Sequence, residues 1–370
     1  MNKSEQIARL RLIRTRNIGP MTYSLLMRRY GSAEAAIAAI PTLAQRGGSK
    51  ISLASIASVT AELESIDAAD AVLLWRDSEY YPERLAQFDD APACITARGN
   101  LHLLTQPMIA IVGARNASIN AQRHAHNIAS ELGKHGYIIV SGMARGIDAA
   151  AHRGALDTGT IGVIAGGIDI VYPPENADLF EEVASRGLLL AEMPPATKPT
   201  PKHFPIRNRV IASLAVGVVV AEAAHRSGSL ITAREAATRG SDVTAVPGSP
   251  LDPRSDGCNR LIRDGATLVQ NVADVIECVS RQPAVRIPPA QFEWTDSMRR
   301  TIDQTAVDRC RQKLAQDLSL DPVDIDKLVS WCEMPDPVVW AAILELEIAG
   351  IVTRHYGNRV ARIAQQSADK

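Results

Sequence analysis

The chain has 370 residues, and its 40 Lys and Arg against 41 Asp and Glu give a formal net charge of −1 at pH 7. This balance excludes a polybasic coat protein, so any site for an anion must be built locally. Aromatic residues make up 4% of the sequence, which excludes a continuous aromatic platform for bases and leaves room only for isolated stacking positions. The length predicts two or three domains.

Targeting signals and metal motifs are not evident in the sequence. The five cysteines never stand in a CxxC spacing, which predicts reduced thiols rather than a zinc site or disulfides. The first residues lack the apolar core of a signal peptide, and the longest apolar runs, such as 214–221, are too short to span a bilayer. We therefore expect a soluble cytoplasmic protein without metal, cofactor or membrane contact.

Residues 1–76 predict a small helical domain. Between two amphipathic stretches lies Asn17-Ile18-Gly19-Pro20, a turn that interrupts helix on both sides. A basic helix after such a turn resembles helix-hairpin-helix or SAM-like modules, whose hairpin amides can contact phosphates. A plain helical packing domain fits the same pattern.

Residues 77–280 predict an α/β domain. Short, uninterrupted apolar runs alternate with helical stretches, which is typical of a parallel sheet buried on both faces. Right-handed crossovers make such a sheet doubly wound and Rossmann-like, with ligands at the carboxyl ends of its strands. The expected strands are 108–112, 137–140, 160–165, 187–191, 215–221 and 242–246.

The last part of the chain predicts a linker and a second small domain. Residues 281–296 are rich in proline and predict the linker. Residues 297–370 show helices followed by two short strands around Tyr356-Gly357-Asn358, the outline of a winged helix. Segment 325–349 is acidic overall and is a poor surface for a duplex backbone. A protein-contact or regulatory module is therefore expected, with duplex binding as the competing hypothesis.

The loop after the first strand of the sheet carries Gly113 and Arg115 in place of the G-x-G-x-x-G of dinucleotide folds. A Gly113 turn brings backbone amides to a helix start, and Arg115 adds a guanidinium for phosphate oxygens. A tight turn beside a surface arginine is the alternative.

The loop after the second strand predicts another anion site. It contains Ser141, Gly142, Arg145, Gly146 and Asp148. Two glycines before a helix allow positive φ and close backbone approach, while the helix N-terminus and the arginine add positive charge. Asp148 is expected to cap or orient the loop. Asp148 and His152 could form an acid/base pair, but a structural pair is favoured because no nucleophile accompanies them.

Stretch 198–209 holds four cations and no acid. They are Lys198, Lys202, Arg207 and Arg209. Its prolines are expected to keep much of it extended. Phe204 lies among these cations, where it could stack on an unpaired base with about 1–3 kcal/mol while Asn208 and the cations meet the backbone. The alternative places Phe204 in the core and the arginines in ion pairs with Glu192 or Glu222.

Ser227, Gly228 and Ser229 open a further helix, which is the third helix start expected at the same edge. Three helix starts and several cations along one edge exceed what one small phosphate ligand requires. An extended polyanion is the expected partner.

Six ordered blocks within roughly 80–280 resemble the DNA-processing protein A family (DprA, or Smf). They are SGMARGIDAAAH (141–152), GGIDIVYPPEN (166–176), HFPIRNRVIASL (203–214), EAAHRSGSLITAREA (222–236), AVPGSP (245–250) and SDGCNRLIRDGA (255–266). The resemblance implies a non-catalytic, homodimeric protein of natural transformation and recombination. Such a protein would bind and shield incoming single-stranded DNA, load the RecA recombinase and relieve inhibition by single-strand binding protein.

Carried onto this sequence, the DNA pocket implied by the resemblance comprises Gly113, Arg115, Ser141, Gly142, Arg145, Gly146, Asp148, Lys202, Phe204, Arg207, Asn208 and Arg209. Ala114 departs from the family's usual hydroxyl residue and removes one contact to phosphate. The competing hypothesis is a nucleotide-processing enzyme of the phosphoribohydrolase-like class, which would need Asp148 and Asp169 as its carboxylates. No G-x-x-x-x-G-K-[ST] motif for ATP hydrolysis occurs.

Overall fold

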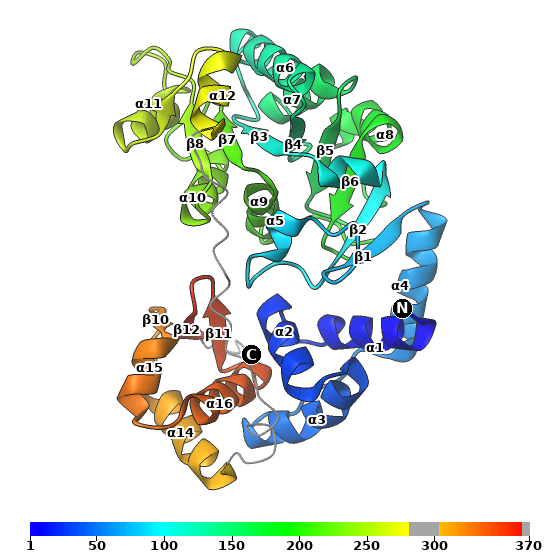
Figure 1. Cartoon of the computed structure of the whole chain (residues 1–370), viewed down its shortest axis with the longest axis vertical. Coiled ribbons are helices and arrows are strands. Elements are labelled where there is room, and N and C mark those ends of the chain that lie inside the picture. Colours follow the sequence, from blue (N-terminus) through cyan, green and yellow to red (C-terminus); the bar gives the residue numbers. More distant parts are fainter. Residues whose placement is uncertain (281–302, 365–370) are drawn as a thin grey trace, which may run out of the picture. The chain divides into compact units, whose positions relative to one another are not determined.

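The computed structural model describes residues 1–280 and 303–364, which divide into two compact units (Figure 1). The first, the sheet unit, is Glu62–Ile287. The second, the two-ended unit, joins Met1–Ala61 to Pro288–Lys370. The predicted linker, 281–296, falls between the described ranges.

Within the described residues the sheet unit holds nine strands in the order β1-β2-β6-β5-β4-β3-β7-β8-β9. The six expected strands are confirmed as β3 (Met108–Val112), β4 (Ile138–Ser141), β5 (Thr160–Ile164), β6 (Leu188–Ala191), β7 (Gly217–Val220) and β8 (Asp242–Ala245). These strands and β9 (Thr267–Leu268) run parallel, whereas β1 (Val72–Trp75) and β2 (Cys94–Gly99) add an antiparallel edge. The fold is the doubly wound, mostly parallel sheet that the sequence predicts.

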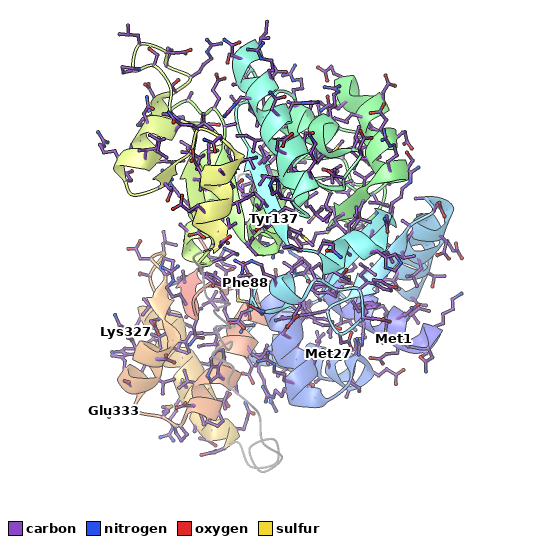
Figure 2. The ribbon with its side chains drawn as sticks, turned by 45° about the horizontal axis from the view of Figure 1, so that its top comes forward. Met1, Met27, Phe88, Tyr137, Lys327 and Glu333 are labelled. Atoms are coloured by element: carbon purple, nitrogen blue, oxygen red, sulfur yellow. The ribbon has the colours of Figure 1, made fainter. Side chains whose placement is uncertain are left out.

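Helices cover both faces of this sheet. Their bounds are α5 (Glu83–Ala86), α6 (Ile119–Lys134), α7 (Ile147–Ala155), α8 (Ala177–Arg186), α9 (His203–Leu214), α10 (Ser229–Thr238), α11 (Asp256–Arg263) and α12 (Val272–Ser280). One core cluster packs α5, α9 and α10 on the strands, and another packs α6, α7 and α12. Phe88 is buried under the guanidinium of Arg239, 5.5 Å from its ring centre, and Tyr137 borders the second cluster (Figure 2).

The order of the strands changes direction between β3 and β7. From β3 the chain moves outward through β4, β5 and β6, whereas from β7 it moves the other way through β8 and β9. Doubly wound sheets bind ligands outside the carboxyl ends of their strands at such a point. The loops that follow β3, β4 and β7 all emerge at this edge.

The two-ended unit combines a helical bundle with a winged helix, as expected. The bundle contains α1 (Lys3–Arg14), α2 (Pro20–Tyr30) and α3 (Ala33–Arg46), and α4 (Ile56–Ala68) continues into the sheet unit. The winged helix contains α14 (Gln304–Asp317), β10 (Val323–Asp324), α15 (Ile325–Cys332), α16 (Asp336–Ile348), β11 (Val352–His355) and β12 (Arg359–Arg362). Across the described ranges, every helix is too short or too polar to cross a membrane.

Helix α16 lies inside the two-ended unit, where it packs on α3. Its Glu345 is fully buried and pairs with Arg311 at 2.5 Å and Arg46 at 3.8 Å. A helix that reads a DNA groove needs an exposed, basic face. The exposed face of α15 carries charges of both signs, Asp326 and Lys327, and Glu333 follows the helix as its C-cap (Figure 2). Most of α16 is therefore occupied in packing within the two-ended unit.

Candidate nucleic-acid interface

The loop after β3 is held by close backbone packing. A Cβ on Gly113 would lie 2.5 Å from Cγ1 of Ile147 and 2.9 Å from the carbonyl oxygen of Glu222, so only glycine fits. The next amide, of Ala114, donates to that same carbonyl at 2.7 Å. The loop therefore turns sharply and leaves the side chain of Arg115 exposed.

The loop after β4 is organised by Asp148, which confirms the expected orienting role. Its buried carboxylate accepts from the amides of Gly142 at 3.1 Å and Ala144 at 3.3 Å. Burial raises the pKa of Asp148, and the nearby guanidinium of Arg207 opposes that shift. Gly146 has φ +75°, and a Cβ there would collide with the carbonyl of Ala114. The absence of a side chain at Gly146 therefore allows the loops after β3 and β4 to pack against each other.

Two expectations for this loop need correction. Gly142 does not adopt positive φ, which occurs instead at Met143 (φ 58°). A Cβ at Gly142 would strike the guanidinium of Arg207, so this glycine makes room for a side chain of the protein. Ser141 is fully buried and donates its hydroxyl to the carbonyl of Ile111 at 2.6 Å, which directs it away from any ligand.

The basic stretch is helical rather than extended from His203 onward, because α9 begins there. Pro205 lies in the first turn, where its missing amide hydrogen costs no intrahelical bond. Arg207 is only 7% exposed and donates to the carbonyls of Val163, at 2.8 Å, and Gly142. Burial lowers the pKa of Arg207 to about 10, and Asp148 opposes that shift.

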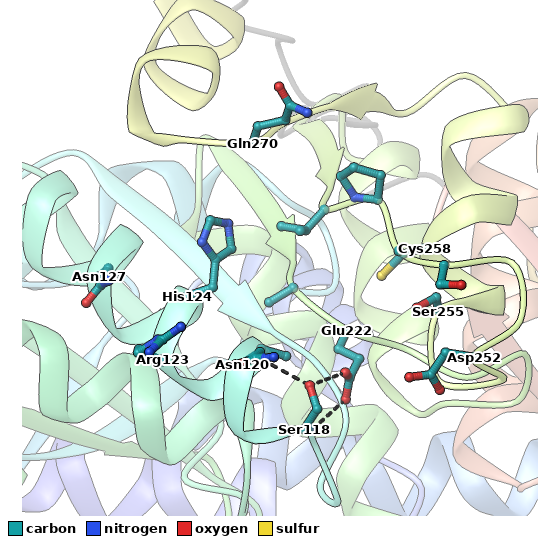
Figure 3. A pocket seen from close by; sticks show the side chains of 16 residues that line it. Ser118, Asn120, Arg123, His124, Asn127, Glu222, Asp252, Ser255, Cys258 and Gln270 are labelled. Carbon is teal, nitrogen blue, oxygen red and sulfur yellow. Dashed lines mark hydrogen bonds between the residues drawn. The ribbon is translucent and has the colours of Figure 1, made fainter.

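Arg209 also serves the fold. It pairs with Glu192 and donates to the carbonyl of Asp90, as the alternative interpretation of the sequence held for one arginine. Glu222, the other acid considered, accepts instead from the amide and hydroxyl of Ser118, at 2.9 and 2.7 Å (Figure 3). Arg207 and Arg209 are thus held by bonds within the protein, and the expectation of four freely presented cations is wrong for these two.

A cation and two aromatic rings meet at the carboxyl edge. The guanidinium of Arg115 lies 4.8 Å from the ring centre of Phe204, which is half-buried. The ring of Tyr172, 42% exposed, lies 5.9 Å from the Phe204 ring at an interplanar angle of 54°. We call Arg115, Tyr172 and Phe204 the stacking cluster. It lines a small pocket together with Gly142 and Arg145.

Sequence reasoning did not assign Tyr172 a role. The signal was present, because Tyr172 precedes two prolines in the loop after β5, and that loop ends at the same edge as the others. An aromatic residue on a proline-stiffened loop at a ligand-binding edge is a candidate for stacking.

Further cations lie in the loops that follow β6 and β7. Lys198, Lys202 and Arg226 are exposed, and among residues 1–280 and 303–364 no carboxylate forms an ion pair with Arg115 or Lys202. Arg145 pairs with Glu175 at 3.3 Å, but both side chains are 58% exposed. An exposed pair of this kind contributes only about 0–1 kcal/mol, so a phosphate can replace the carboxylate.

The third loop joins the same edge through Asn208, whose side-chain amide donates to the carbonyl of Gly228 at 3.5 Å. The hydroxyls of Ser227 and Ser229 bond each other at 2.7 Å. Helix α10 starts at Ser229 without a side-chain cap, but the amide of Ser229 donates to Oγ of Ser227 at 3.4 Å, and the amides of Leu230 and Ile231 donate to the carbonyls of Ser227 and Gly228. These amides therefore hold the turn itself.

A larger cavity of about 650 Å³ lies on the α6 side of the β3 loop (Figure 3). It is lined by polar groups that include Asn120, His124, Asn127 and Gln270. The thiol of Cys258 lies at its wall and donates to the carbonyl of Val220, and burial raises the pKa of this thiol to about 12. The thiol is therefore no nucleophile at neutral pH.

The candidate acid/base residues have structural partners. His152 is fully buried, and its Nδ1 lies 2.7 Å from Oγ1 of Thr160, which itself donates to the carbonyl of Ile139. Nδ1 must therefore carry the proton, and Nε2 has no partner in the described part of the chain. Asp169 accepts from the amide of Ala196 at 2.8 Å. Both Asp148 and Asp169 hold loops rather than face a substrate.

Acid is expected to unfold the sheet unit partly through His152. Burial lowers its pKa from 6.5 to about 3, so the unfolded chain binds this proton first as the pH falls. The stabilisation is complete above pH 6.5 and is lost between pH 6.5 and 3, at about 1.4 kcal/mol per pH unit. Denaturant unfolding at pH 7 and 4.5 should show the wild type losing about 2.5 kcal/mol more than His152→Asn. Equal losses in both chains would contradict this assignment.

The sheet, its three amide-rich loops and its two flanking modules define a class of three-part DNA-processing protein. The family model described as DNA recombination-mediator protein A matches residues 72–280. Two more, a DprA-like N-terminal HHH domain and a DprA winged helix domain, match residues 3–65 and 300–358. The chain belongs to the DNA recombination-mediator protein A (DprA/Smf) family, whose role is DNA processing and the mediation of recombination.

Individual relatives agree with this assignment. The DNA processing protein DprA of Streptococcus pneumoniae is 46% identical over 198 residues, which cover 53% of this chain and 70% of that protein. Protein Smf of Synechocystis is 33% identical over 332 residues, covering 81% and 82%. A solved structure of DNA processing protein A from Helicobacter pylori, described for its single-stranded DNA binding mode, matches with a TM-score of 0.53 and 30% identity, covering 57% of this chain and 96% of that one.

Proposed function

We propose that this protein binds single-stranded DNA along the carboxyl edge of its sheet, independently of base sequence. There it shields incoming strands in natural transformation and recombination, and helps load the RecA recombinase against single-strand binding protein. It acts in the cytoplasm as a homodimer, by binding rather than catalysis. The observation that carries the proposal is the stacking cluster, in which Arg115 lies on Phe204 beside Tyr172.

The chemistry of an unpaired strand fits this edge. Its phosphates need cations, which Arg115 and Lys202 supply, and amide donors, for which the loops offer those amides that do not already bond within the protein. Its bases need flat apolar faces, and every base can stack on Phe204 or Tyr172. Such contacts do not distinguish base edges, so the proposed binding is independent of sequence. The Helicobacter pylori relative, described for its single-stranded DNA binding mode, supports the proposal.

The structure suggests how the predicted residues divide their roles. We propose that Arg115, Arg145, Lys202 and Phe204 contact the strand, together with the backbone around Gly142 and Ser227–Ser229. Asp148, Arg207, Asn208 and Arg209 position these loops through the bonds described above, and Gly113, Ser141 and Gly146 allow the loops to pack.

Fluorescence anisotropy with oligonucleotides of several sequences, titrated with salt, tests the proposal. Lys202→Ala should weaken binding to every sequence alike and lower the slope of log K against log salt by about 0.7, because one phosphate contact is lost. Lys134→Ala is the matched control, since Lys134 is an exposed lysine at the opposite end of α6, away from the carboxyl edge. Equal behaviour of the two variants would refute the site.

A further inference from the structure

The larger cavity on the α6 side of the β3 loop has no part in the proposed strand binding. Its lining shares no residue with that of the pocket at the stacking cluster. Its volume of about 650 Å³ falls within the range of about 300–1,000 Å³ of small-molecule sites. The loops after β3, β7 and β8 meet at this cavity, where the order of the strands changes direction. Doubly wound sheets place ligands at this point, so the cavity is a candidate for a second ligand.

Ser255 places an unused hydroxyl at the wall of this cavity. The residue is 8% exposed, and its Oγ makes no hydrogen bond within the described part of the chain. A Cβ on Gly248 would collide with this oxygen, so the glycine leaves the space that the hydroxyl occupies. The oxygen keeps accessible surface, in contrast to the enclosed Nε2 of His124. Most buried polar groups are hydrogen-bonded, so this open hydroxyl indicates a missing partner.

Glu222 supplies acceptor oxygens at the end of β7. It is 8% exposed and comes two residues after the strand ends at Val220. Its carboxylate accepts from the amide and the hydroxyl of Ser118, which fixes its orientation (Figure 3). A carboxylate has about four lone-pair sites, so about two remain for a ligand. In doubly wound sheets, a carboxylate near a strand end is the group that accepts from ribose hydroxyls.

Two carboxamides line the cavity from other elements. Asn127 belongs to α6, and Gln270 follows β9. Both are exposed, and neither side chain makes a hydrogen bond in residues 1–280 and 303–364. Each carboxamide offers one acceptor and two donors, which match the alternating donors and acceptors at the edge of a nucleobase.

The other walls suit a flat ring without charge. Ala121, Ala221, Val246 and Pro247 give the cavity apolar surface. Burial lowers the pKa of His124 below its usual 6.5, so this imidazole adds no charge at pH 7. Apolar walls with a few placed polar groups are typical of sites for small organic ligands.

The charges at the cavity disfavour an anion. Arg123 lines the cavity but is exposed, and Asp252 is neutralised by Arg254, which pairs with it at 2.7 Å. The buried charge of the lining is therefore the negative one of Glu222. Hard metal cations need several oxygen ligands, and a single buried carboxylate does not provide them. An uncharged ligand with hydroxyls fits this lining.

We propose that this cavity binds a ribonucleoside, whose sugar hydroxyls meet Glu222 and Ser255 and whose base meets the carboxamides of Asn127 and Gln270. The site goes beyond the proposed function, because it uses none of the residues assigned to the strand. The ribose carries the 2′-hydroxyl that DNA lacks, so single-stranded DNA is not the expected occupant.

Calorimetric titration of the full chain with adenosine tests the site, since an adenine edge pairs well with a carboxamide. The wild type should bind one adenosine per chain. Ser255→Ala removes a hydroxyl that caps no helix amide, so this variant should melt like the wild type without ligand. It should bind adenosine about 2- to 12-fold more weakly, the effect of one lost hydrogen bond.

A second variant and a matched control complete this test. Asn127→Ala should weaken adenosine binding by a similar factor, and alanine at this exposed position of α6 favours the helix. Ser130→Ala is the control, because Ser130 lies on the same helix outside the cavity. It should bind adenosine like the wild type. No binding to the wild type, or equal affinity in all four chains, overturns the proposal.

Two related ligands test the chemistry of the site. 2′-Deoxyadenosine lacks one sugar hydroxyl and should bind more weakly than adenosine, and equal binding would overturn the role given to the ribose. Adenosine 5′-monophosphate adds negative charge, and tighter binding than adenosine would overturn the assignment of an uncharged ligand. Because these titrations contain no DNA, Lys202→Ala should bind adenosine like the wild type whatever its effect on single-strand binding.

Discussion

Replacing Arg207 by methionine is expected to lower the free energy of unfolding of the sheet unit by about 3–5 kcal/mol, because two buried carbonyls lose their charged donor and a nearby buried carboxylate loses its counter-charge. The variant leaves the carboxylate of Asp148 buried without its counter-charge and deprives the carbonyls of Gly142 and Val163 of their donor. Denaturant unfolding at pH 7 measures the loss.

A double variant distinguishes the electrostatic interaction between Asp148 and Arg207 from a simple loss of packing. Asp148→Asn combined with Arg207→Met should be less destabilised than the sum of the two single variants, because no unpaired charge then remains buried. Arg234→Met on α10 is the control, since Arg234 is exposed and its replacement should change stability by no more than about 0.5 kcal/mol. Strictly additive losses would show that Arg207 and Asp148 do not act as a pair.

Replacing Phe204 by alanine is expected to weaken single-stranded DNA binding by about 5- to 150-fold, which corresponds to about 1–3 kcal/mol of lost base stacking. The variant also removes the ring on which Arg115 rests, so the guanidinium loses its fixed position. Anisotropy titrations at one fixed salt concentration measure the change. The loss should be similar for all oligonucleotide sequences.

Two further variants test whether the ring itself acts. Phe204→Tyr keeps the flat face and should retain most of the affinity. Trp331→Ala removes another exposed aromatic residue that lies under a cation, since Nζ of Lys313 is 3.9 Å from its ring centre, but it belongs to the winged helix. That variant should bind like the wild type. A wild-type affinity for Phe204→Ala would exclude the stacking cluster from the interface.

The central strands were predictable because they are buried on both faces. Such strands need apolar side chains at every position, as β3 shows with Met108–Val112, and this pattern is visible without knowledge of neighbours. Strands β1 and β2 were missed because they pair antiparallel at the sheet's edge, where β1 is only four residues long and only its last two residues are buried.

The prediction of an extended segment at α9 was wrong because it relied on residue types rather than on the spacing of the residues that are buried. The prolines and cations suggested an extended, DNA-facing segment. Arg207, Val210, Ile211 and Leu214 follow the i, i+3, i+4, i+7 spacing of one helix face, and all four are buried. That spacing places Arg207 on the face that packs against the strands. Its charge is accommodated by Asp148, a partner 59 positions earlier that composition alone does not identify.

The joining of the two ends of the chain in one unit could not be derived from the sequence. The hairpin of residues 17–20 belongs to the N-terminal helices, and the side-chain amide of Asn17 donates to the carbonyl of Ile348, more than three hundred residues later. The packing of α16 on the N-terminal helices brings these groups together.

The two-ended unit is built from the first and last parts of the chain, and this order matters during protein synthesis. Its first helices leave the ribosome before all of Glu62–Ile287, whereas α16, which covers α3, is made near the end. At about 5–20 residues per second, the interval is on the order of ten seconds to a minute. The nascent chain thus completes its sheet unit first, and for that time the surface of α3 stays uncovered and open to chaperones.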